Sequence, residues 1–461
     1  MKKIILVLAV TATFNSARSQ SPSPSGQPQV ASEAQGMGPF SFSLQQAIDF
    51  AMKNQTQMQN TGYDEQIAKH KVKETIGIGL PLIHGNVGAQ DFLEIPTSVL
   101  PANAFNPFAS PDELMAVQFG TQYSASAGIE ASQLVFSSDY LVGLQASKTF
   151  LELSRKAVQR TRVETSVAVS KAYYTVLLNE ERMKLIDANI SRLKKLMDDT
   201  QVLNTNGFVE KIDLDRITVA YNNLVVEKEK IQRLMGLGNS FLKFQMGMDQ
   251  QANLSVADKL ADIKLTPPAD AGKIDYENRV EYSLMQSQKN ISQLQLKRNK
   301  LTYLPSAALF GNASANAYRN KFNFFDAKLG WYPTLIIGAR INVGIFDGLQ
   351  THHRIQQSKL EILKADNSLK MIQQGIDLEI ASAKANLTNS ASSLEIQKKN
   401  IELAESIYKA AKMKYEQGVG SNLEVMSAET GLKEAQTNYF SALYDALIAK
   451  VDYDKANGNI K

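Results

Sequence analysis

The histidines are the residues of this chain whose side chains could bind a metal ion or transfer a proton. There are four of them, His70, His84, His352 and His353. The adjacent pair would point about 100° apart on a helix, and no acidic residue follows at ligand spacing before Glu361. This pattern predicts no zinc site. The absence of cysteine also excludes thiolate ligands, disulfides and a cysteine nucleophile.

Two glycine pairs, at 77–79 and 236–238, could in principle approach a phosphate. Both lack the remaining glycines of a nucleotide-binding fingerprint. The chain also contains no G-x-S-x-G, H-E-x-x-H or P-loop sequence. We therefore predict that the protein is not an enzyme and that it uses neither a cofactor nor a metal ion.

The composition of the 461-residue chain is that of a folded protein, with 44% hydrophobic and 21% charged residues. Its formal net charge is +4, and Lys2, Lys3 and Arg18 at the N-terminus contribute much of that excess. A nucleic-acid-binding protein would be more basic. We therefore expect no nucleic-acid partner.

The N-terminus has the pattern of a secretory signal. Two lysines precede an apolar run from Ile4 to Val10, and a small-residue cleavage site follows, so we assign 1–19 to a signal peptide. Residues 20–41 are rich in Ser, Pro, Gln and Gly, and we expect a flexible linker there. No later segment approaches the roughly 20 consecutive apolar residues of a spanning helix, so any entry into a membrane must use strands.

Long helices are predicted wherever proline is absent, because an interior proline removes a helix hydrogen bond. The proline-free stretches are 40–80, 112–266, 269–304 and 334–461. Apolar residues from Ile376 to Tyr415 recur at steps of three and four, as in helices that pack side by side. A helix over 350–417 would be roughly 100 Å long at about 1.5 Å per residue, so the molecule is expected to be elongated.

Two segments alternate between apolar and polar residues with the period of a strand, at 123–131 and 335–345. One face of each is apolar, which suits contact with lipid, and the other carries polar residues or glycine, which suits a water-filled lumen. We predict that Glu130, Arg340 and Asn342 face this lumen. The alternative is an ordinary hairpin that packs on a soluble core.

Aromatic residues gather near the ends of these segments, as expected of the rings at a membrane interface. We assign to that interface Tyr123, Phe136, Trp331, Tyr332 and Phe346.

The chain contains an internal repeat. Gly207, Asp213 and Gly247 recur at the spacing of Gly418, Glu424 and Gly458. We divide the chain into a first repeat over 42–268 and a second over 269–461, each of them a helix, a strand hairpin, a long helix and a further helix. The predicted helices cover 43–79, 138–204, 213–247, 274–302, 350–417 and 422–457, and the predicted strands cover 82–91, 120–136, 306–318 and 332–346.

The lengths of these elements indicate an assembly. Two short helices stacked end to end match the length of one long helix. Two repeats therefore supply four full-length helical columns and four strands. Four strands cannot close a barrel, and open edges in lipid leave backbone groups unpaired at a cost of several kcal/mol each. Several chains must therefore contribute to one barrel.

The sequence resembles the TolC-type outer-membrane efflux family over nearly all of the mature chain. The segments that carry the resemblance are 44–48 (LQQAI), 304–305 (LP), 345–348 (IFDG), 414–418 (KYEQG) and 423–425 (LEV), with Gly458 near the end. This resemblance implies a mainly α fold with membrane β-strands: a trimer with a twelve-stranded β-barrel in the outer membrane, continued by a twelve-helix tunnel into the periplasm. It also implies an exit duct for solutes or proteins, in an efflux or type I secretion system with a periplasmic adaptor and an inner-membrane transporter. The rival interpretation is a secreted coiled-coil structural or adaptor protein without a pore.

By position in the family, Tyr415, Asp213 and Glu424 correspond to the periplasmic constriction. Gly420 replaces an arginine that locks the best-known member, and Ser427 replaces a second acid. Asp213 and Glu424 could equally be first-turn acids that stabilise a helix N-terminus, and Tyr415 could be a seam residue. The helix-turn tips carry Gly207, Gly418 and Gly420, and in the family such tips receive the adaptor.

Overall fold

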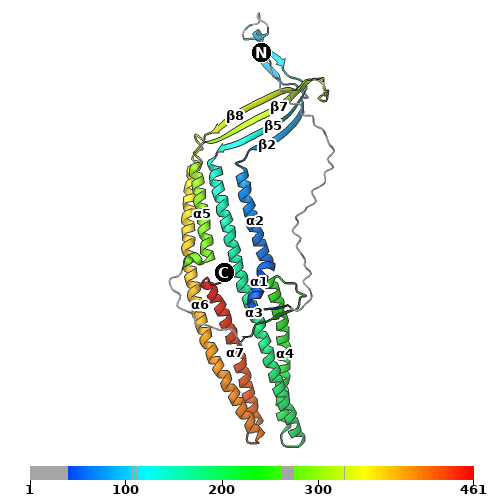
Figure 1. The fold of residues 1–461 in the computed structure, drawn as a ribbon, viewed down its shortest axis with the longest axis vertical. Coiled ribbons are helices and arrows are strands. Elements are labelled where there is room, and N and C mark those ends of the chain that lie inside the picture. The colour runs from blue at the N-terminus through cyan, green and yellow to red at the C-terminus, as the bar shows by residue number, and fades with distance from the viewer. Residues whose placement is uncertain are drawn as a thin grey trace.

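The computed structural model describes residues 40–105, 108, 110, 112–260, 275–326 and 328–460. The predicted signal peptide, most of the predicted linker and the boundary between the repeats at 268 and 269 lie outside the described residues. Figure 1 shows an elongated molecule with a strand region at one end and two helix turns at the other.

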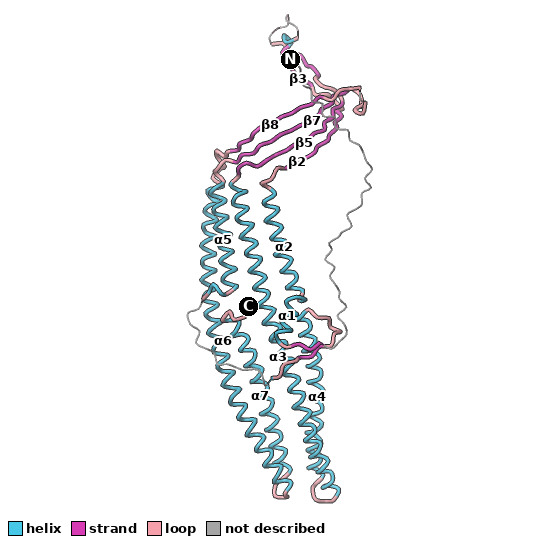
Figure 2. The backbone as a smooth tube through the Cα atoms, in the orientation of Figure 1, coloured by secondary structure: helices cyan, strands magenta, loops and turns pink. Residues whose placement is uncertain are grey.

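Helices make up most of the described chain, and they form two levels along the long axis (Figure 2). Their bounds are α1 (Leu44–Asn54), α2 (Thr56–Gly77), α3 (Ser138–Thr205), α4 (Lys211–Met246), α5 (Val280–Leu301), α6 (Gln350–Glu416) and α7 (Asn422–Ala456). The two long helices, α3 and α6, have 68 and 67 residues. Beside them α2 lies above α4 and α5 lies above α7. Each repeat therefore contributes one continuous full-length helix and one pair of shorter helices stacked end to end.

The helix expected over 43–79 is divided at Gln55, whose backbone is extended at φ −66° and ψ 125°. The side chain of Gln55 caps the second helix by accepting a hydrogen bond from the Met58 N–H at 2.7 Å. Gly247, in the left-handed conformation at the end of α4, lies against this break. No proline or glycine marks position 55, so sequence pattern alone did not show the division.

The principal sheet has four antiparallel strands in the order β2-β5-β7-β8. Their bounds are β2 (Leu82–Asp91), β5 (Tyr123–Phe136), β7 (Ser306–Arg319) and β8 (Tyr332–Asn342). The strand expected over 332–346 ends at Asn342, because its partner β7 begins at Ser306, opposite Asn342, and offers nothing for later residues to pair with. The sheet joins the two repeats through β5 and β7 and leaves β2 and β8 as edges.

Two smaller strand pairs were not anticipated from the sequence. β3 (Thr97–Pro101) and β4 (Leu114–Gln118) form a hairpin within the connection from β2 to β5. β1 (Phe40–Phe42) pairs in parallel with β6 (Leu254–Val256), so the expected linker over 20–41 ends in a strand rather than in flexible chain. A short 3-10 turn, η1 (Ala102–Ala104), follows β3, and another, η3 (Tyr276–Asn278), precedes α5.

The hydrophobic core follows the helix seams rather than forming one central mass. One cluster around Tyr173 and Leu447 joins α1, α3, α4 and α7 at mid-height. A second around Leu193, Tyr408 and Val425 joins α3, α4, α6 and α7 nearer the turns. A third around Ile380 joins α6 to the end of α7.

No helix in the described part of the chain is both long and apolar enough to cross a membrane.

Candidate functional site: the polar sheet face and the helix-turn tips

The strand register gives the four-stranded sheet one apolar face. Val87, Ala127, Ala315 and Pro333 pair in one row across all four strands. The large apolar side chains on this face are open to solvent in the single chain, with Val87 87%, Leu335 74% and Ile337 81% exposed. An apolar face of this size on a water-facing surface is unfavourable, at about 25 cal/mol per Å², so it requires a cover.

The opposite face of the same sheet is polar. His84, Glu130 and Asn312 pair in one row, which continues to Ile336 on β8. By the same register Arg340 and Asn342 lie on this face of β8. The Arg340 guanidinium lies 5.4 Å from the Phe310 ring centroid. The structure therefore brings the three residues predicted to face a lumen onto one face.

The predicted interface aromatics divide between the two faces. Tyr123 belongs to the apolar face and contacts Phe322, with ring centroids 5.9 Å apart. Tyr332 pairs with Asn316 and lies on the polar face beside Tyr318, and its place among the aromatic residues of the membrane interface stays a prediction. The alternation of strand side chains explains this, because nearness to a strand end does not determine the face.

The other three predicted aromatics lie near the sheet ends. Trp331 immediately precedes β8 and contacts Phe324. At the helix-proximal end, Phe136 pairs with Ala307 on the apolar face, and Phe346 lies beyond β8.

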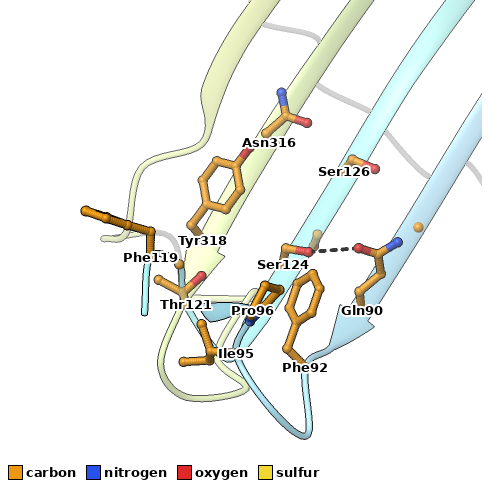
Figure 3. A pocket seen from close by; sticks show the side chains of 13 residues that line it. Gln90, Phe92, Ile95, Pro96, Phe119, Thr121, Ser124, Ser126, Asn316 and Tyr318 are labelled. Atoms are coloured by element: carbon orange, nitrogen blue, oxygen red, sulfur yellow. Dashed lines mark hydrogen bonds between the residues drawn. The ribbon is translucent and has the colours of Figure 1, made fainter. Parts of the chain in front are cut away.

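The two ends of the connection from β2 to β5 border a partly open cavity of about 420 Å³ on the polar face (Figure 3). The floor of the cavity comes from the strands and its wall from the connection, and none of the lining side chains is charged. Gln90 accepts a hydrogen bond from Ser124 at 3.4 Å. The lining residues are Gly88, Gln90, Phe92, Ile95, Pro96, Phe119, Gly120, Thr121, Ser124, Ala125, Ser126, Asn316 and Tyr318.

At the opposite end, the two helix-turn tips close α3 and α6 in the same way. Gly207 and Gly418 adopt φ values of 78° and 75°, which only glycine adopts readily. The Phe208 N–H donates to Leu203 O at 2.9 Å, and the Val419 N–H donates to Lys414 O at 3.0 Å. These are Schellman closures that satisfy the last helix carbonyls.

The tips also present apolar side chains. Phe208 is 78% and Val419 77% exposed, at equivalent positions of the repeat. Gly420 has no room for a side chain, since a Cβ there would lie 2.9 Å from the Lys414 Cβ. The three tip glycines predicted from the sequence therefore shape both reversals.

The residues assigned to a constriction lie near one another, but no hydrogen bond or ion pair between their side chains is found among the described residues. The Asp213 main-chain carbonyl accepts a hydrogen bond from the Asn422 amide at 3.0 Å, while its carboxylate lies 3.6 Å from Arg216. Glu424 is exposed at the start of α7, and its N–H donates to Ser421 Oγ at 3.3 Å. Tyr415 packs into the lower hydrophobic cluster, and its buried hydroxyl has no hydrogen-bond partner among the described residues.

Comparison with known proteins identifies the class of the molecule. The family model "Outer membrane efflux protein" matches residues 295–459. The probable efflux pump outer membrane protein TtgC of Pseudomonas putida is 23% identical over 350 residues, covering 73% of this chain and 69% of that protein. The outer membrane protein TolC of Vibrio cholerae is 20% identical over 342 residues, covering 73% and 77%.

Over 73% of its length the chain is thus similar to TolC-type outer membrane efflux proteins, and its residues 295–459 match their family.

Solved structures show the same fold. A membrane protein from Pseudomonas aeruginosa superposes with a TM-score of 0.72 at 15% identity, covering 90% of this chain and 92% of that chain. The open state of the MtrE outer membrane channel of Neisseria gonorrhoeae gives 0.72 at 14% identity, covering 90% and 88%. These structures share the fold of the chain. The family match and the sequence relatives are what identify it as a bacterial outer-membrane channel protein rather than an enzyme.

A buried polar stripe on α7 was not predicted from the sequence. Asn422, Glu429 and Gln436 recur every seven residues and are each at most 6% exposed. Each faces the α3/α4 hairpin: Asn422 contacts Asp213 of α4, and the other two face α3. The seven-residue spacing was visible in the sequence, but polar residues at such positions are more often solvated than buried.

Two members of that stripe, Glu429 and Gln436, belong to one connected network. The Asn189 amide nitrogen donates to Gln436 Oε1 at 2.7 Å, and the Asn189 oxygen accepts from Arg192. Arg192 lies 3.9 Å from the Glu429 carboxylate and 5.3 Å from the Tyr408 ring centroid. Burial raises the pKa of Glu429, although the positive charges of Arg192, Lys412 and Lys433 oppose that shift.

Proposed function

We propose that this protein is the outer-membrane exit duct of a tripartite efflux or type I secretion system. Three copies would close a twelve-stranded barrel in the outer membrane, continued by a twelve-helix tunnel into the periplasm. Transport through the duct is passive, because the chain carries no nucleotide-binding motif and its pump partner supplies the energy.

The observation that carries this proposal is the two-faced sheet with two open edges. Its apolar face is exposed and its polar face is lined by residues such as Glu130 and Arg340. The alternation of strand directions makes β2 and β8 antiparallel to each other. The β8 edge of one copy can therefore continue the ladder at β2 of the next, which pairs every backbone group without a free edge in lipid.

The helices support the same closure. Packing runs from α2 and α4 through α3 to α5 and α7 and then to α6, so α4 and α6 form the free edges of the lower level. Exposed apolar residues at seven-residue steps occur on both edges. On α4 they are Ile212, Val219 and Val226, and on α6 they form two separate pairs, Met371 with Leu378 and Ile396 with Leu403. Two different surfaces that fit each other give a head-to-tail contact, which closes into a ring.

The α6 edge also carries a groove of about 690 Å³ between α6 and α7. Its lining is rich in small residues, including Ala404, Ala411 and Gly431, and Glu424 lies at its tip-proximal end. Small residues let a neighbouring helix approach closely. We assign this groove to the α4 edge of the next copy.

At the periplasmic end the two tips would receive the adaptor, with Phe208 and Val419 as exposed apolar contacts. Three copies of Glu424 around the axis would repel one another and attract cations, which favours cation passage in a narrow opening. Tyr415 and Asp213 would position the helices on either side of that constriction. At the outer end, the connection from β2 to β5, which borders the cavity on the polar face, would narrow the lumen.

The proposal is tested by purifying the protein from outer membranes in detergent, measuring its mass and recording currents in planar bilayers. The expected result is an assembly of three copies that forms cation-preferring pores. A monomer that stays in solution without detergent and conducts nothing would favour the rival interpretation, a secreted coiled-coil rod.

A further inference from the structure

The cavity on the polar face of the sheet lies over two successive rows of the strand ladder, near the strand ends that are remote from the helices (Figure 3). Residues two apart on a strand point to the same side of a sheet, so both rows present their side chains to the cavity. The paired residues are Gly88, Ser126 and Asn316 in one row and Gln90, Ser124 and Tyr318 in the next.

The space and the walls of the cavity are built from parts that are held in place. Gly88 leaves the floor open, because a Cβ there would lie 3.6 Å from Ser126 Oγ. The Phe92 N–H donates to Gln122 O at 2.7 Å, which extends the ladder by one residue beyond β2 and fixes one wall. On another side the Phe119 ring contacts the Phe105 ring, with centroids 6.2 Å apart. A ligand would therefore meet a site that is already formed.

The polar groups of the cavity are amides and hydroxyls. Gln90 Oε1 accepts a hydrogen bond from Ser124 at 3.4 Å, which leaves the Gln90 amide nitrogen to donate to a ligand. The Asn316 amide nitrogen donates to Thr334 Oγ1 at 3.2 Å, which leaves the Asn316 oxygen to accept. The Ser126 hydroxyl can do either. The cavity thus offers donors and acceptors side by side.

This lining selects a class of ligand. None of the lining side chains is charged, so an ion would lose water there without gaining a countercharge. A carboxylate only accepts hydrogen bonds and an ammonium group only donates them, whereas a hydroxyl does both, as the amides and hydroxyls of the cavity do. The volume of about 420 Å³ falls within the range of about 300–1,000 Å³ for small-molecule sites.

We propose that this cavity is a binding site for a neutral saccharide. The hydroxyls of a sugar ring would pair with Gln90, Asn316 and Ser126, and the C–H face of the ring would lie against the aromatic side chains of Phe119 and Tyr318. The position of the site at the outer end of a lumen rests on the proposed function, whereas binding itself does not require a pore.

Equilibrium dialysis of the purified protein with radiolabelled maltose tests the site. The detergent must carry no sugar headgroup, because such a headgroup would compete. We expect saturable binding of one maltose per chain, and displacement by unlabelled glucose. Glucuronate, which is charged at neutral pH, and benzamide, which is neutral and aromatic but has no hydroxyl, should displace it several-fold less well.

The chain offers matched controls on the same face of the sheet. Tyr318→Ala removes a ring that lines the cavity, whereas Tyr332→Ala removes its neighbour, 6.5 Å away between ring centroids and outside the lining. Ser126→Leu fills the cavity, whereas Ser132→Leu makes the same change six residues along β5, also outside the lining. The first member of each pair should weaken maltose binding several-fold, and the second should bind as wild type does. Unfolding temperatures check that all four variants are folded.

Currents in planar bilayers locate the site along the duct. Maltose added to the chamber that faces the strand end should interrupt the current more often than maltose added to the chamber that faces the helix turns. Tyr318→Ala should reduce these interruptions several-fold, and Tyr332→Ala should not.

The outcomes separate the saccharide site from the proposed duct. Saturable binding that is weakened only in the cavity variants supports the site. The site is overturned if wild type shows no saturable binding, if Tyr318→Ala binds as Tyr332→Ala does, if glucuronate or benzamide displaces maltose as well as glucose does, or if interruptions are equally frequent from both chambers. Binding without any pore would leave the site standing and refute the duct, and pores without binding would do the reverse.

Discussion

Asn189 on α3 donates a hydrogen bond of 2.7 Å to Gln436 on α7, and both side chains are buried. This amide pair joins the two repeats of the chain at a level where each repeat otherwise packs mainly on itself. A buried polar pair adds little net stability but fixes which residues face each other, as polar positions do in coiled coils. It therefore sets the register between the two hairpins.

Truncating one member of that pair should cost more than replacing both. Asn189→Ala leaves the Gln436 amide buried without its donor, which we expect to lower the free energy of unfolding by about 1–3 kcal/mol. Replacing both residues by leucine should be close to neutral. Thermal unfolding in detergent measures the two variants, and equal losses in both would contradict the assigned role.

Gly247 should be the least replaceable glycine among those at the helix ends. It has φ +69°, and a Cβ there would lie 2.5 Å from the Asn54 carbonyl oxygen at the break between α1 and α2. Gly247→Ala should therefore destabilise the protein by well over about 1 kcal/mol. Gly236→Ala, within α4 with open space around the added carbon, should be neutral or stabilising by up to about 1 kcal/mol.

The stability of the contact between the α3/α4 and α6/α7 hairpins should depend on pH through Glu429. Burial raises its pKa, so the folded state binds the proton more tightly than the unfolded chain. The contribution of this group to the free energy of unfolding therefore rises as pH falls through the raised pKa and is smallest at neutral pH. The groups that face this carboxyl are Arg192, Tyr408, Lys412 and Lys433.

Comparison with Glu429→Gln isolates this dependence from that of other titrating groups. The variant should be more stable than wild type at neutral pH, and the difference should shrink on acidification. Unfolding temperatures of both proteins across mildly acidic to neutral pH provide the measurement. A difference that stays constant would show that the carboxyl does not titrate in this range.

Two adjacent isoleucines on β8 test the assignment of the sheet faces. Ile337 lies on the apolar face, whereas Ile336 pairs with Asn312 on the polar face. Ile337→Lys should cost about 2–4 kcal/mol if that face meets lipid near the middle of the membrane, and it should reduce the yield of assembled protein. Ile336→Lys makes the same change toward the proposed lumen and should assemble normally, as judged by the band of the proposed trimer on mild gels.

Much of this architecture could be predicted from the residues. Proline-free stretches gave the long helices, and glycine marked both tips because a left-handed residue is needed there. The break at Gln55 could not be predicted, because no proline or glycine marks it and the residue packed against it, Gly247, is far away in the chain. Tyr332 lies on the polar face because it pairs with Asn316 in the strand register. The position of a residue near a strand end does not determine that register.

The candidate site divides in the same way. The alternation of apolar and polar residues along the strands predicted that Glu130, Arg340 and Asn342 share one face of the sheet. The stripe through Glu429 was missed because its burial arises from packing between the two repeats, and local periodicity gives no information on such packing. The roles of Tyr415, Asp213 and Glu424 in a constriction stay predictions.

The central claim is that the β8 edge of one copy pairs with the β2 edge of the next. Cysteines placed in turn at Ile83, Gly85, Val87 and Ala89 of β2, each with one at Leu335 of β8, test it in a chain that has no cysteine of its own. Oxidation in native outer membranes should give, at one or two of these positions, covalent species of two and three copies and none larger. Correctly folded protein that yields only single chains at every position would contradict the account.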